Sequence, residues 1–296
     1  YEIKKLKVVF KILILGSSGT LGNQIYRELK KITNIKLFNT GLKKRKIDFT
    51  NKIEFKKFIL SINPDLIINC IAYTNVDKCE NYKLISKKIN YGIVSEIFKL
   101  KAQKKLKFNF IHFSTDQFYN QKRKQSSKET SKIFLINNYC KHKRMAELTC
   151  IKNRCLILRT NFFGKSVANK SFSDWVFNSF RKNKTKYLFN DVYFNPLRIA
   201  TIAKIISSII VKKKYYHCGI YNLGSKNRIL KSDFALLFAE KTGVINDNYE
   251  YIKVNKLLKV KRSNNMFMNV SKFEKKFKFK LPTISNEIKN EANNYF

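Results

Sequence analysis

Residues 11–33 form a strand, a glycine-rich turn and a helix in succession, and no other stretch limits the fold as strongly. The apolar run at 12–15 is typical of a buried parallel strand, and apolar residues recur at helical spacing from Leu21 to Leu29. Three of the nine glycines stand between them, at intervals of three residues: Gly16, Gly19 and Gly22. Only glycine lets the backbone N–H groups and a helix N-terminus approach a pyrophosphate this closely. An ordinary glycine turn is the alternative, but strand and helix both lie where a nucleotide-binding loop needs them.

Strand and helix signals alternate along most of the chain. Further strands are predicted at 35–39, 66–70, 108–113, 155–158 and 220–223. One helix is predicted to begin near residue 51, and a separate long helical pattern follows residue 80 and ends near residue 105. Further helices are predicted to begin at residue 138 and to span 199–212 and 232–242. This alternation predicts an α/β fold, a Rossmann-like doubly wound parallel sheet with right-handed crossovers.

The charge of the chain is extreme. It has 61 Lys and Arg against 20 Asp and Glu, a formal net charge of +41. Such a charge raises nucleic acid or an anionic surface as alternative partners. The lysines are spread along the whole chain, which is also rich in Ile, Asn, Phe and Tyr and poor in Ala, Gly and Pro. We interpret the charge as a global bias in residue usage and expect no nucleic-acid partner.

No membrane span is expected either. The longest apolar candidate, at 199–211, is too short and is interrupted by Lys204. The N-terminus superficially resembles a signal peptide, but Lys11 breaks its apolar stretch and the glycine turn follows at once. The cysteines show no CxxC or metal-ligand spacing, so we assign no metal ligand and expect free thiols in a reducing, cytoplasmic compartment. There are six of them: Cys70, Cys79, Cys140, Cys150, Cys155 and Cys218.

The second predicted strand bears on the choice of dinucleotide. In such folds an acidic residue near its end holds the adenosine ribose 2′-OH. No Asp or Glu occurs between Leu29 and Ile47, and the turn carries cations instead. These cations are Lys43, Lys44 and Arg45. They would suit a 2′-phosphate, so we favour NADP(H) over NAD(H), with a solvated basic loop as the alternative.

A tyrosine and a lysine four residues apart suggest carbonyl reduction. Tyr139 and Lys143 share one face of a predicted helix, and Thr115 follows the end of an earlier strand. Hydride addition to a ketone creates an alkoxide that must be protonated, and a nearby ammonium group favours the phenolate and lowers the tyrosine pKa. A threonine hydroxyl can orient the carbonyl oxygen. The alternative is a half-buried aromatic residue beside a solvated lysine.

Several motifs then occur in one order along the chain. They are Gly16-x-x-Gly19-x-x-Gly22, Asp48-Phe49-Thr50, PDLIIN at 64–69, Ala72-Tyr73-Thr74-x-Val76-Asp77-x-x-Glu80, Asn90, Ser114-Thr115-Asp116, Tyr139-x-x-x-Lys143, Glu147 and Leu158-Arg159-Thr160. With them the chain resembles the extended short-chain dehydrogenases/reductases of the dTDP-4-dehydrorhamnose reductase type. The resemblance covers nearly the whole chain, is dense up to Thr160 and is loose after it.

This resemblance implies NAD(P)H-dependent reduction of the 4-keto group of a nucleotide-linked deoxysugar, in the cytoplasm and in rhamnose or polysaccharide biosynthesis. It implies a catalytic trio of Thr115, Tyr139 and Lys143. The cofactor would be bordered by Gly16, Ser18, Gly19, Leu21, Gly22, Asp48, Phe49, Ala72, Tyr73 and Lys143. The substrate would lie near Thr74, Asp116, Gln117 and Phe162. A homodimer is one assembly that we consider.

The resemblance also implies two lobes with the active site in the cleft between them. Residues 1–165 would form the NAD(P)-binding Rossmann-like domain, and part of 190–225 would return to it. Residues 166–296 would mainly form a smaller C-terminal substrate-binding lobe.

Four positions depart from the family pattern. Gln117 replaces an aromatic residue, Cys140 replaces a glycine, Phe162 replaces a tryptophan, and Ser263 replaces the proline after Arg262. Gln117 and Phe162 should face the substrate, so they bear on the identity of the sugar. None of the four departures changes a residue of the glycine turn or of the catalytic trio.

Three other functions compete with reduction. A nucleotide-sugar epimerase or dehydratase would share the fold, but such dehydratases commonly need an acid pair after the threonine, and here Asp116 is followed by Gln117. A non-catalytic NAD(P)-binding regulatory protein is the second alternative, because fold does not fix function. The intact trio counts against it. Nucleic-acid binding, from the charge alone, ranks last.

Overall fold

The computed structural model describes residues 9–40, 49, 51–121, 125–182 and 185–296. Its centre is a six-stranded sheet in the order β10-β5-β4-β3-β1-β2, and every pair of neighbouring strands is parallel. The strands are β1 (Phe10–Leu15), β2 (Ile35–Asn39), β3 (Leu66–Asn69), β4 (Asn109–Thr115), β5 (Leu156–Thr160) and β10 (Gly219–Leu223). The predicted doubly wound parallel sheet is therefore confirmed.

The two faces of the sheet carry separate apolar cores because successive side chains of a strand point to opposite faces. In β1, Ile12 and Ile14 belong to one buried cluster, and Leu13 and Leu15 belong to the other. The other central strands divide in the same way, which explains why their sequences are continuously apolar rather than alternating.

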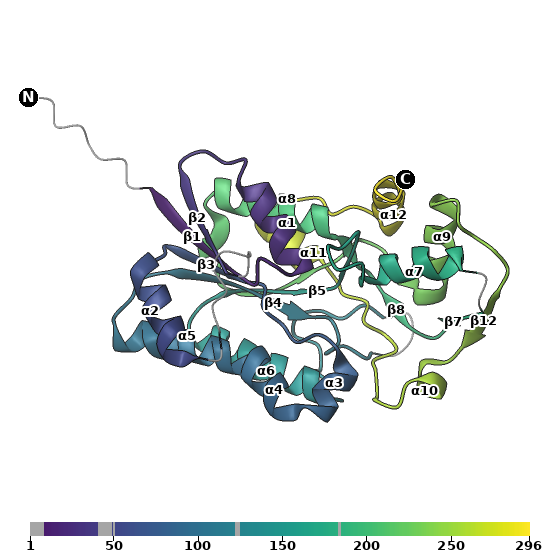
Figure 1. The fold of residues 1–296 in the computed structure, drawn as a ribbon, viewed down its shortest axis with the longest axis horizontal. Coiled ribbons are helices and arrows are strands. Elements are labelled where there is room, and N and C mark those ends of the chain that lie inside the picture. Colours follow the sequence, from purple (N-terminus) through teal and green to yellow (C-terminus); the bar gives the residue numbers. More distant parts are fainter. Residues whose placement is uncertain (1–8, 41–48, 50, 122–124, 183–184) are drawn as a thin grey trace, which may run out of the picture.

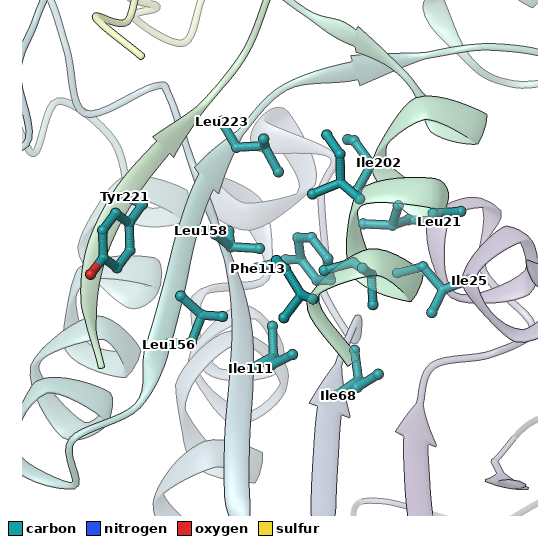
Figure 2. Packing of buried hydrophobic residues seen from close by; sticks show 14 of the residues in the cluster. Leu21, Ile25, Ile68, Ile111, Phe113, Leu156, Leu158, Ile202, Tyr221 and Leu223 are labelled. Atoms are coloured by element: carbon teal, nitrogen blue, oxygen red, sulfur yellow. The ribbon is translucent and has the colours of Figure 1, made fainter. Parts of the chain in front are cut away.

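Helices cover both faces (Figure 1). One face is covered by α1 (Thr20–Leu29), α8 (Ile199–Val211) and α11 (Ser271–Phe277). In Figure 2, Leu21 and Ile25 of α1 and Ile202 of α8 pack over Ile68, Ile111, Phe113, Leu156 and Leu158. The other face is covered by α2 (Lys52–Ile62), α5 (Ile93–Gln103) and α6 (Asn138–Lys152). The Asn51 side chain caps the start of α2 by accepting hydrogen bonds from the Ile53 and Glu54 N–H groups.

The long helical pattern before residue 105 is not one helix. It divides into α3 (Val76–Asn81), α4 (Lys83–Lys87), the π-helical turn η1 (Lys88–Gly92) and α5. The helical spacing of apolar residues does not reveal such breaks, because a π-turn shifts the register by only one residue.

The C-terminal part adds three two-stranded sheets and its own apolar core. The sheets pair β11 (Ile229–Leu230) with β8 (Tyr193–Phe194), β12 (Tyr249–Ile252) with β7 (Lys186–Phe189), and β6 (Phe162–Phe163) with β9 (Leu197–Arg198). The helices are α7 (Phe172–Arg181), α9 (Lys231–Lys241), α10 (Val254–Leu257) and α12 (Ile284–Ala292), and a 3-10 turn, η2, spans Lys214–Tyr216. The core brings Phe163, Val176, Phe234 and Ile288 together. The division of the chain into two lobes near residue 165 stays a prediction.

All six cysteines are free, as predicted. Within the ranges that the model describes, no helix combines the length and the apolar character that crossing a membrane requires.

Candidate active site

The glycine turn between β1 and α1 is closely packed. Gly16 has a φ of 78°, which favours glycine, and a side chain there would meet the backbone of Cys70 and Ile71 at 3.0–3.1 Å. A Cβ on Gly22 would collide with the Gly16 carbonyl group. The Gly16 carbonyl also accepts a hydrogen bond from the Gly19 N–H at 3.0 Å. The turn is therefore compact enough for a phosphate group to approach the backbone.

The N-terminus of α1 has no side-chain cap, because the residue at the capping position is Gly19. Its first N–H groups are thus left for a ligand, and the helix dipole favours an anionic one. The residues present therefore fit the diphosphate of a dinucleotide. Ser17, a residue that sequence reasoning missed, donates a hydrogen bond to the Thr40 carbonyl at 2.8 Å and ties the turn to the end of β2.

A cavity of about 460 Å³ opens at the carboxyl ends of β3, β4 and β5. Carboxyl ends of parallel strands are where sheets of this kind bind ligands. One wall is formed by the start of α1, and another by residues 170–172 at the start of α7. Most of the predicted site residues line this single cavity: Gly19, Leu21, Ala72, Thr74, Thr115, Asp116, Gln117, Tyr139, Lys143 and Phe162.

The remaining predicted residues lie elsewhere. Gly16 and Gly22 form the turn beside the cavity, and Ser18 is exposed. Tyr73 is half-buried and does not line the cavity. Phe49 packs edge-on against Phe55 and lines a separate hollow. Four residues lie outside the described part of the chain: Lys43, Lys44, Arg45 and Asp48.

Tyr139 and Thr115 reach the cavity from different elements. Tyr139 is in the first turn of α6, which begins after the capping side chain of Asn137, and Thr115 ends β4. Both residues are buried, with 7% and 3% of their surface exposed. Burial raises the pKa of Tyr139, and a hydrogen bond with the Thr115 side chain opposes that shift. The Tyr139 pKa is thus raised, where the sequence predicted a lowered one, because burial of the phenol dominates. The phenol therefore keeps its proton at neutral pH and can donate it.

Lys143 follows one turn later on α6 and is also buried. Its Nζ donates a hydrogen bond to the Phe113 carbonyl at 2.6 Å, which fixes the ammonium group beneath the cavity. Burial lowers the pKa of Lys143 to about 8, although the negative charge of Glu147 opposes this shift. The lysine therefore carries its charge at neutral pH and loses it in mild alkali.

Asp116 is held in place by its motif neighbour Thr115 and by Asn161, which the sequence did not indicate. Asn161 Nδ2 donates to Asp116 Oδ2 at 2.8 Å, and Thr115 Oγ1 donates to Oδ1 at 3.4 Å. Burial raises the pKa of Asp116 to about 6, opposed by the Asn161 hydrogen bond and by the charge of Lys231. Asn161 follows the end of β5, a position that could have been noticed. Lys231 begins α9, and no local signal connects it with Asp116.

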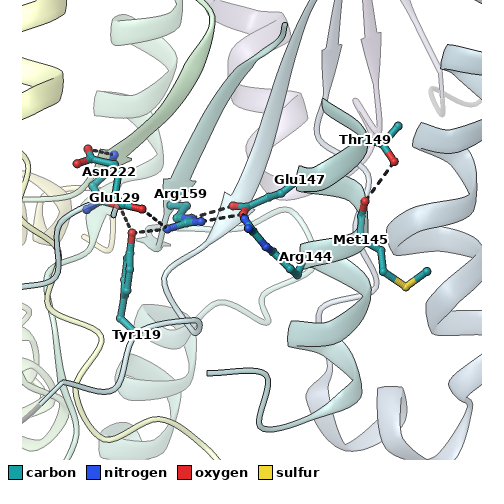
Figure 3. A network of polar contacts seen from close by, with 8 residues as sticks. All are labelled: Tyr119, Glu129, Arg144, Met145, Glu147, Thr149, Arg159 and Asn222. Atoms are coloured by element: carbon teal, nitrogen blue, oxygen red, sulfur yellow. Dashed lines mark hydrogen bonds and ion pairs between the residues drawn. The ribbon is translucent and has the colours of Figure 1, made fainter. Parts of the chain in front are cut away.

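A buried network lies behind α6 (Figure 3). Arg159 donates to both carboxylate oxygens of Glu147 and, through Nη1, to the Tyr119 hydroxyl at 2.6 Å. Tyr119 in turn donates to Asn222 of β10 at 2.8 Å. Glu147 has a pKa below its usual value because hydrogen bonds and charge from Arg159 outweigh its burial. The network links α6 with strands β5 and β10.

Asn90 fixes the segment that follows β3. It lies in the π-turn η1, where its Nδ2 donates to the Tyr73 carbonyl at 3.0 Å and its Oδ1 accepts from the Tyr73 N–H at 2.9 Å. Ala72 and Thr74, on either side of Tyr73, line the cavity. π-turns often occur at functional sites, and this one holds a cavity wall in place.

Comparison with known proteins agrees with this geometry. The model of the RmlD substrate binding domain family matches residues 10–296. The dTDP-4-dehydrorhamnose reductase of Escherichia coli (strain K12) is 26% identical over 303 residues, covering 96% of this chain and 98% of that protein.

Solved structures show the same fold. A dTDP-4-dehydrorhamnose reductase from Clostridium acetobutylicum ATCC 824 has a TM-score of 0.86 at 22% identity, covering 96% of this chain and 99% of that one. The reductase of that name from Bacillus anthracis str. Ames, in complex with NADP, has a TM-score of 0.84 at 18% identity, covering 97% and 100%. DesIV, a dTDP-glucose 4,6-dehydratase from Streptomyces venezuelae with NAD and TYD bound, has a TM-score of 0.82 at 13% identity, covering 97% of each.

The family model matches nearly the full length of the chain, and the predicted resemblance is thereby confirmed. The chain belongs to the RmlD substrate binding domain family.

Proposed function

We propose that this chain is an NAD(P)H-dependent oxidoreductase that reduces the 4-keto group of a dTDP-linked 6-deoxyhexose, as in dTDP-4-dehydrorhamnose. The observation that carries the proposal is that Thr115, Tyr139 and Lys143 line one cavity with the uncapped start of α1. The relatives named dTDP-4-dehydrorhamnose reductase support the enzyme class and the substrate.

The three side chains divide the work of protonating the reduced carbonyl. When bound, NAD(P)H supplies the hydride for the carbonyl carbon. Tyr139 donates its phenolic proton to the carbonyl oxygen as negative charge develops there. Lys143 stabilises the resulting phenolate, because an opposite charge within a buried site favours the ionised form. Thr115 orients the carbonyl oxygen through its hydroxyl.

The glycine turn, the start of α1 and Ala72 would hold the cofactor, and Thr74, Asp116, Gln117 and Phe162 would contact the sugar. We propose NADP(H) rather than NAD(H), because cations follow β2 where NAD(H) enzymes carry an acid. The reductase solved with NADP supports this choice, while the dehydratase solved with NAD has the same fold. The free thiols support a reducing, cytoplasmic location.

A nucleotide-sugar dehydratase or epimerase is the second candidate, because the dehydratase DesIV has the same fold. A single acid, Asp116, follows Thr115, and the next residue is the neutral Gln117. Dehydration needs a second acid–base group at the sugar. This pair of residues therefore supports plain reduction.

The test measures how much cofactor is oxidised for each molecule of sugar that is converted. Purified protein is incubated with a dTDP-linked 4-keto-6-deoxy sugar and either NADPH or NADH, and cofactor consumption is compared with the amount of alcohol formed. Reduction predicts one alcohol for each cofactor oxidised, with NADPH preferred. Conversion of the sugar without net consumption of cofactor would favour the epimerase, and formation of the 4-keto-6-deoxy sugar from a dTDP-linked hexose would favour the dehydratase. No conversion together with no cofactor binding would refute the proposal.

A further inference from the structure

His142 connects the helix that carries Tyr139 and Lys143 to another part of the site. It lies on α6 between those two residues, and its side chain is buried. Its Nδ1 lies 2.8 Å from Oγ of Ser86, a residue of α4 with no exposed surface. Neither His142 nor Ser86 lines the cavity. The pair can therefore act on the reaction only through other residues.

The direction of this hydrogen bond follows from Asn90. Asn90 Oδ1 accepts from the Tyr73 N–H, so Nδ2 is the donor to the Tyr73 carbonyl at 3.0 Å and to Ser86 Oγ at 3.3 Å. Because Ser86 Oγ accepts from Asn90, its own hydroxyl proton is left to donate to His142 Nδ1. Nδ1 can accept it, because burial and the charge of Lys87 lower the pKa of His142 and keep the ring neutral at neutral pH.

The other end of this chain of bonds is the backbone of Tyr73. Asn90 binds both the N–H group of Tyr73, at 2.9 Å, and its carbonyl group. The residues on either side, Ala72 and Thr74, line the cavity. Tyr73 also packs against the buried cluster that contains Tyr139. A displacement of Tyr73 would thus move a wall of the cavity and the packing around Tyr139 together.

We infer that His142 is a positioning residue, whose bond to Ser86 keeps this cavity wall in register with Tyr139. This inference rests on the proposed reductase function and adds a residue to its site. The wall and the proton donor come from different segments of the chain, and a misplacement of about 1 Å can lower a rate by about a hundredfold. A continuous chain of buried hydrogen bonds from α6 to the wall limits such a displacement.

The test measures two quantities in three variants: kcat for a dTDP-linked 4-keto-6-deoxy sugar, and the dissociation constant for NADPH. His142→Phe keeps a planar ring but cannot accept from Ser86, and Ser86→Ala removes the donor. Each should lower kcat at least about tenfold and change the NADPH dissociation constant less than about threefold. His142→Asn should restore kcat to within about threefold of wild type, because its side-chain oxygen can accept the same hydrogen bond.

A double-mutant cycle separates this hydrogen bond from independent packing effects. The double variant His142→Phe/Ser86→Ala should have the same kcat as either single variant, within about twofold, because one broken link already uncouples the wall. Independent effects would instead multiply, to a loss of at least about a hundredfold.

Two controls distinguish general damage to the fold from a loss of position. Thr242→Val removes another buried hydroxyl group, which donates to the Phe238 carbonyl at 2.8 Å at the end of α9 and lines no part of the cavity. This variant should have a lower melting temperature and an unchanged kcat. His217→Phe changes a partly exposed histidine outside the cavity and should also leave kcat unchanged. If His142→Phe does not fold, Ser86→Ala is compared with Thr242→Val.

Each result has a separate meaning. No reduction of the sugar by wild-type protein would refute the proposed function itself. Reduction by wild type with an unchanged kcat in His142→Phe and Ser86→Ala would overturn this inference and leave the reductase standing. Multiplied losses in the double variant, or no recovery of kcat in His142→Asn, would also overturn it. So would a loss of kcat in Thr242→Val as large as that in Ser86→Ala.

Discussion

Glu147 and Arg159 form a two-pronged ion pair, with 2.8 Å between Nε and Oε1 and 2.8 Å between Nη2 and Oε2, and neither side chain has any solvent-exposed surface. Glu147 lies one helical turn after Lys143 on α6, and Arg159 lies on β5. The pair therefore fixes the helix that carries Tyr139 and Lys143 against the sheet that carries Thr115. Its carboxylate also supplies the charge that opposes loss of the Lys143 proton.

Removing that carboxylate should destabilise the fold. Glu147→Gln leaves Arg159 buried without its counter-charge, a change that typically costs about 3–5 kcal/mol. Because the folded pKa of Glu147 is lowered, its stabilisation is present above the unfolded pKa and is lost as the pH falls through the folded one. Urea unfolding should thus show a large difference between variant and wild type at neutral pH that shrinks in acid.

The matched control for this experiment is Glu28→Gln. Glu28 pairs with Lys31 at 2.6 Å, but the Lys31 side chain is 68% exposed, so this loss should cost at most about 1 kcal/mol. An equal loss of unfolding free energy in the two variants would mean that the buried ion pair stabilises the fold no more than the exposed one.

Tyr139→Phe should remove the proton donor and leave the cavity wall in place. We expect kcat to fall by about 10²–10⁴-fold. The dissociation constant for NADPH should change by less than about threefold, which is below 1 kcal/mol. Tyr82→Phe, at a residue 53% exposed, is the control and should retain full activity. Wild-type turnover by Tyr139→Phe would exclude this residue as the acid.

The activity should fall as the pH rises through about 8, where Lys143 loses its proton. The neutral amine no longer stabilises the Tyr139 phenolate, so kcat/KM should decline on the alkaline side. An arginine keeps its charge throughout this range. Whatever activity Lys143→Arg retains should therefore lack the decline. A wild-type profile that stays flat well above pH 8 would contradict this role.

Gly22→Ala should disrupt the cofactor turn. The new Cβ would collide with the Gly16 carbonyl, so the backbone that faces the cofactor must move. We expect NADPH binding, measured by fluorescence titration, to weaken by at least about tenfold, or 1.4 kcal/mol. Gly92→Ala is the control, because a Cβ there meets no atom closer than 3.8 Å. Equal cofactor affinity in both variants would show that close packing at Gly22 is not required.

The sequence is most informative where one short segment determines the structure. Strands β1, β3 and β4 are apolar on both faces, so a run such as 12–15 identifies a buried parallel strand without knowledge of its partners. The glycine turn is equally local, because Gly16 and Gly22 are required by contacts within one strand–turn–helix unit and with the end of β3.

The sequence is less informative where distant segments meet. Lys231 lies within electrostatic reach of Asp116 but stands in no motif. Ser263 anchors Gln117, although the sequence marked it only as a departure from the family pattern. The π-turn at Asn90 also escapes a search for helical periodicity. Glu147 and Arg159 were both recognised as motif residues, yet only the fold brings them into one ion pair.

The most direct test of the reductase function is the fate of the transferred hydrogen. Wild-type protein is given a dTDP-linked 4-keto-6-deoxy sugar and NADPH deuterated at the transferable C4 position, and the product is analysed by mass spectrometry and NMR. Carbonyl reduction predicts one deuterium atom in the product, bonded to C4 of the sugar. A converted sugar without deuterium, or with deuterium at another carbon, would contradict reduction of the 4-keto group.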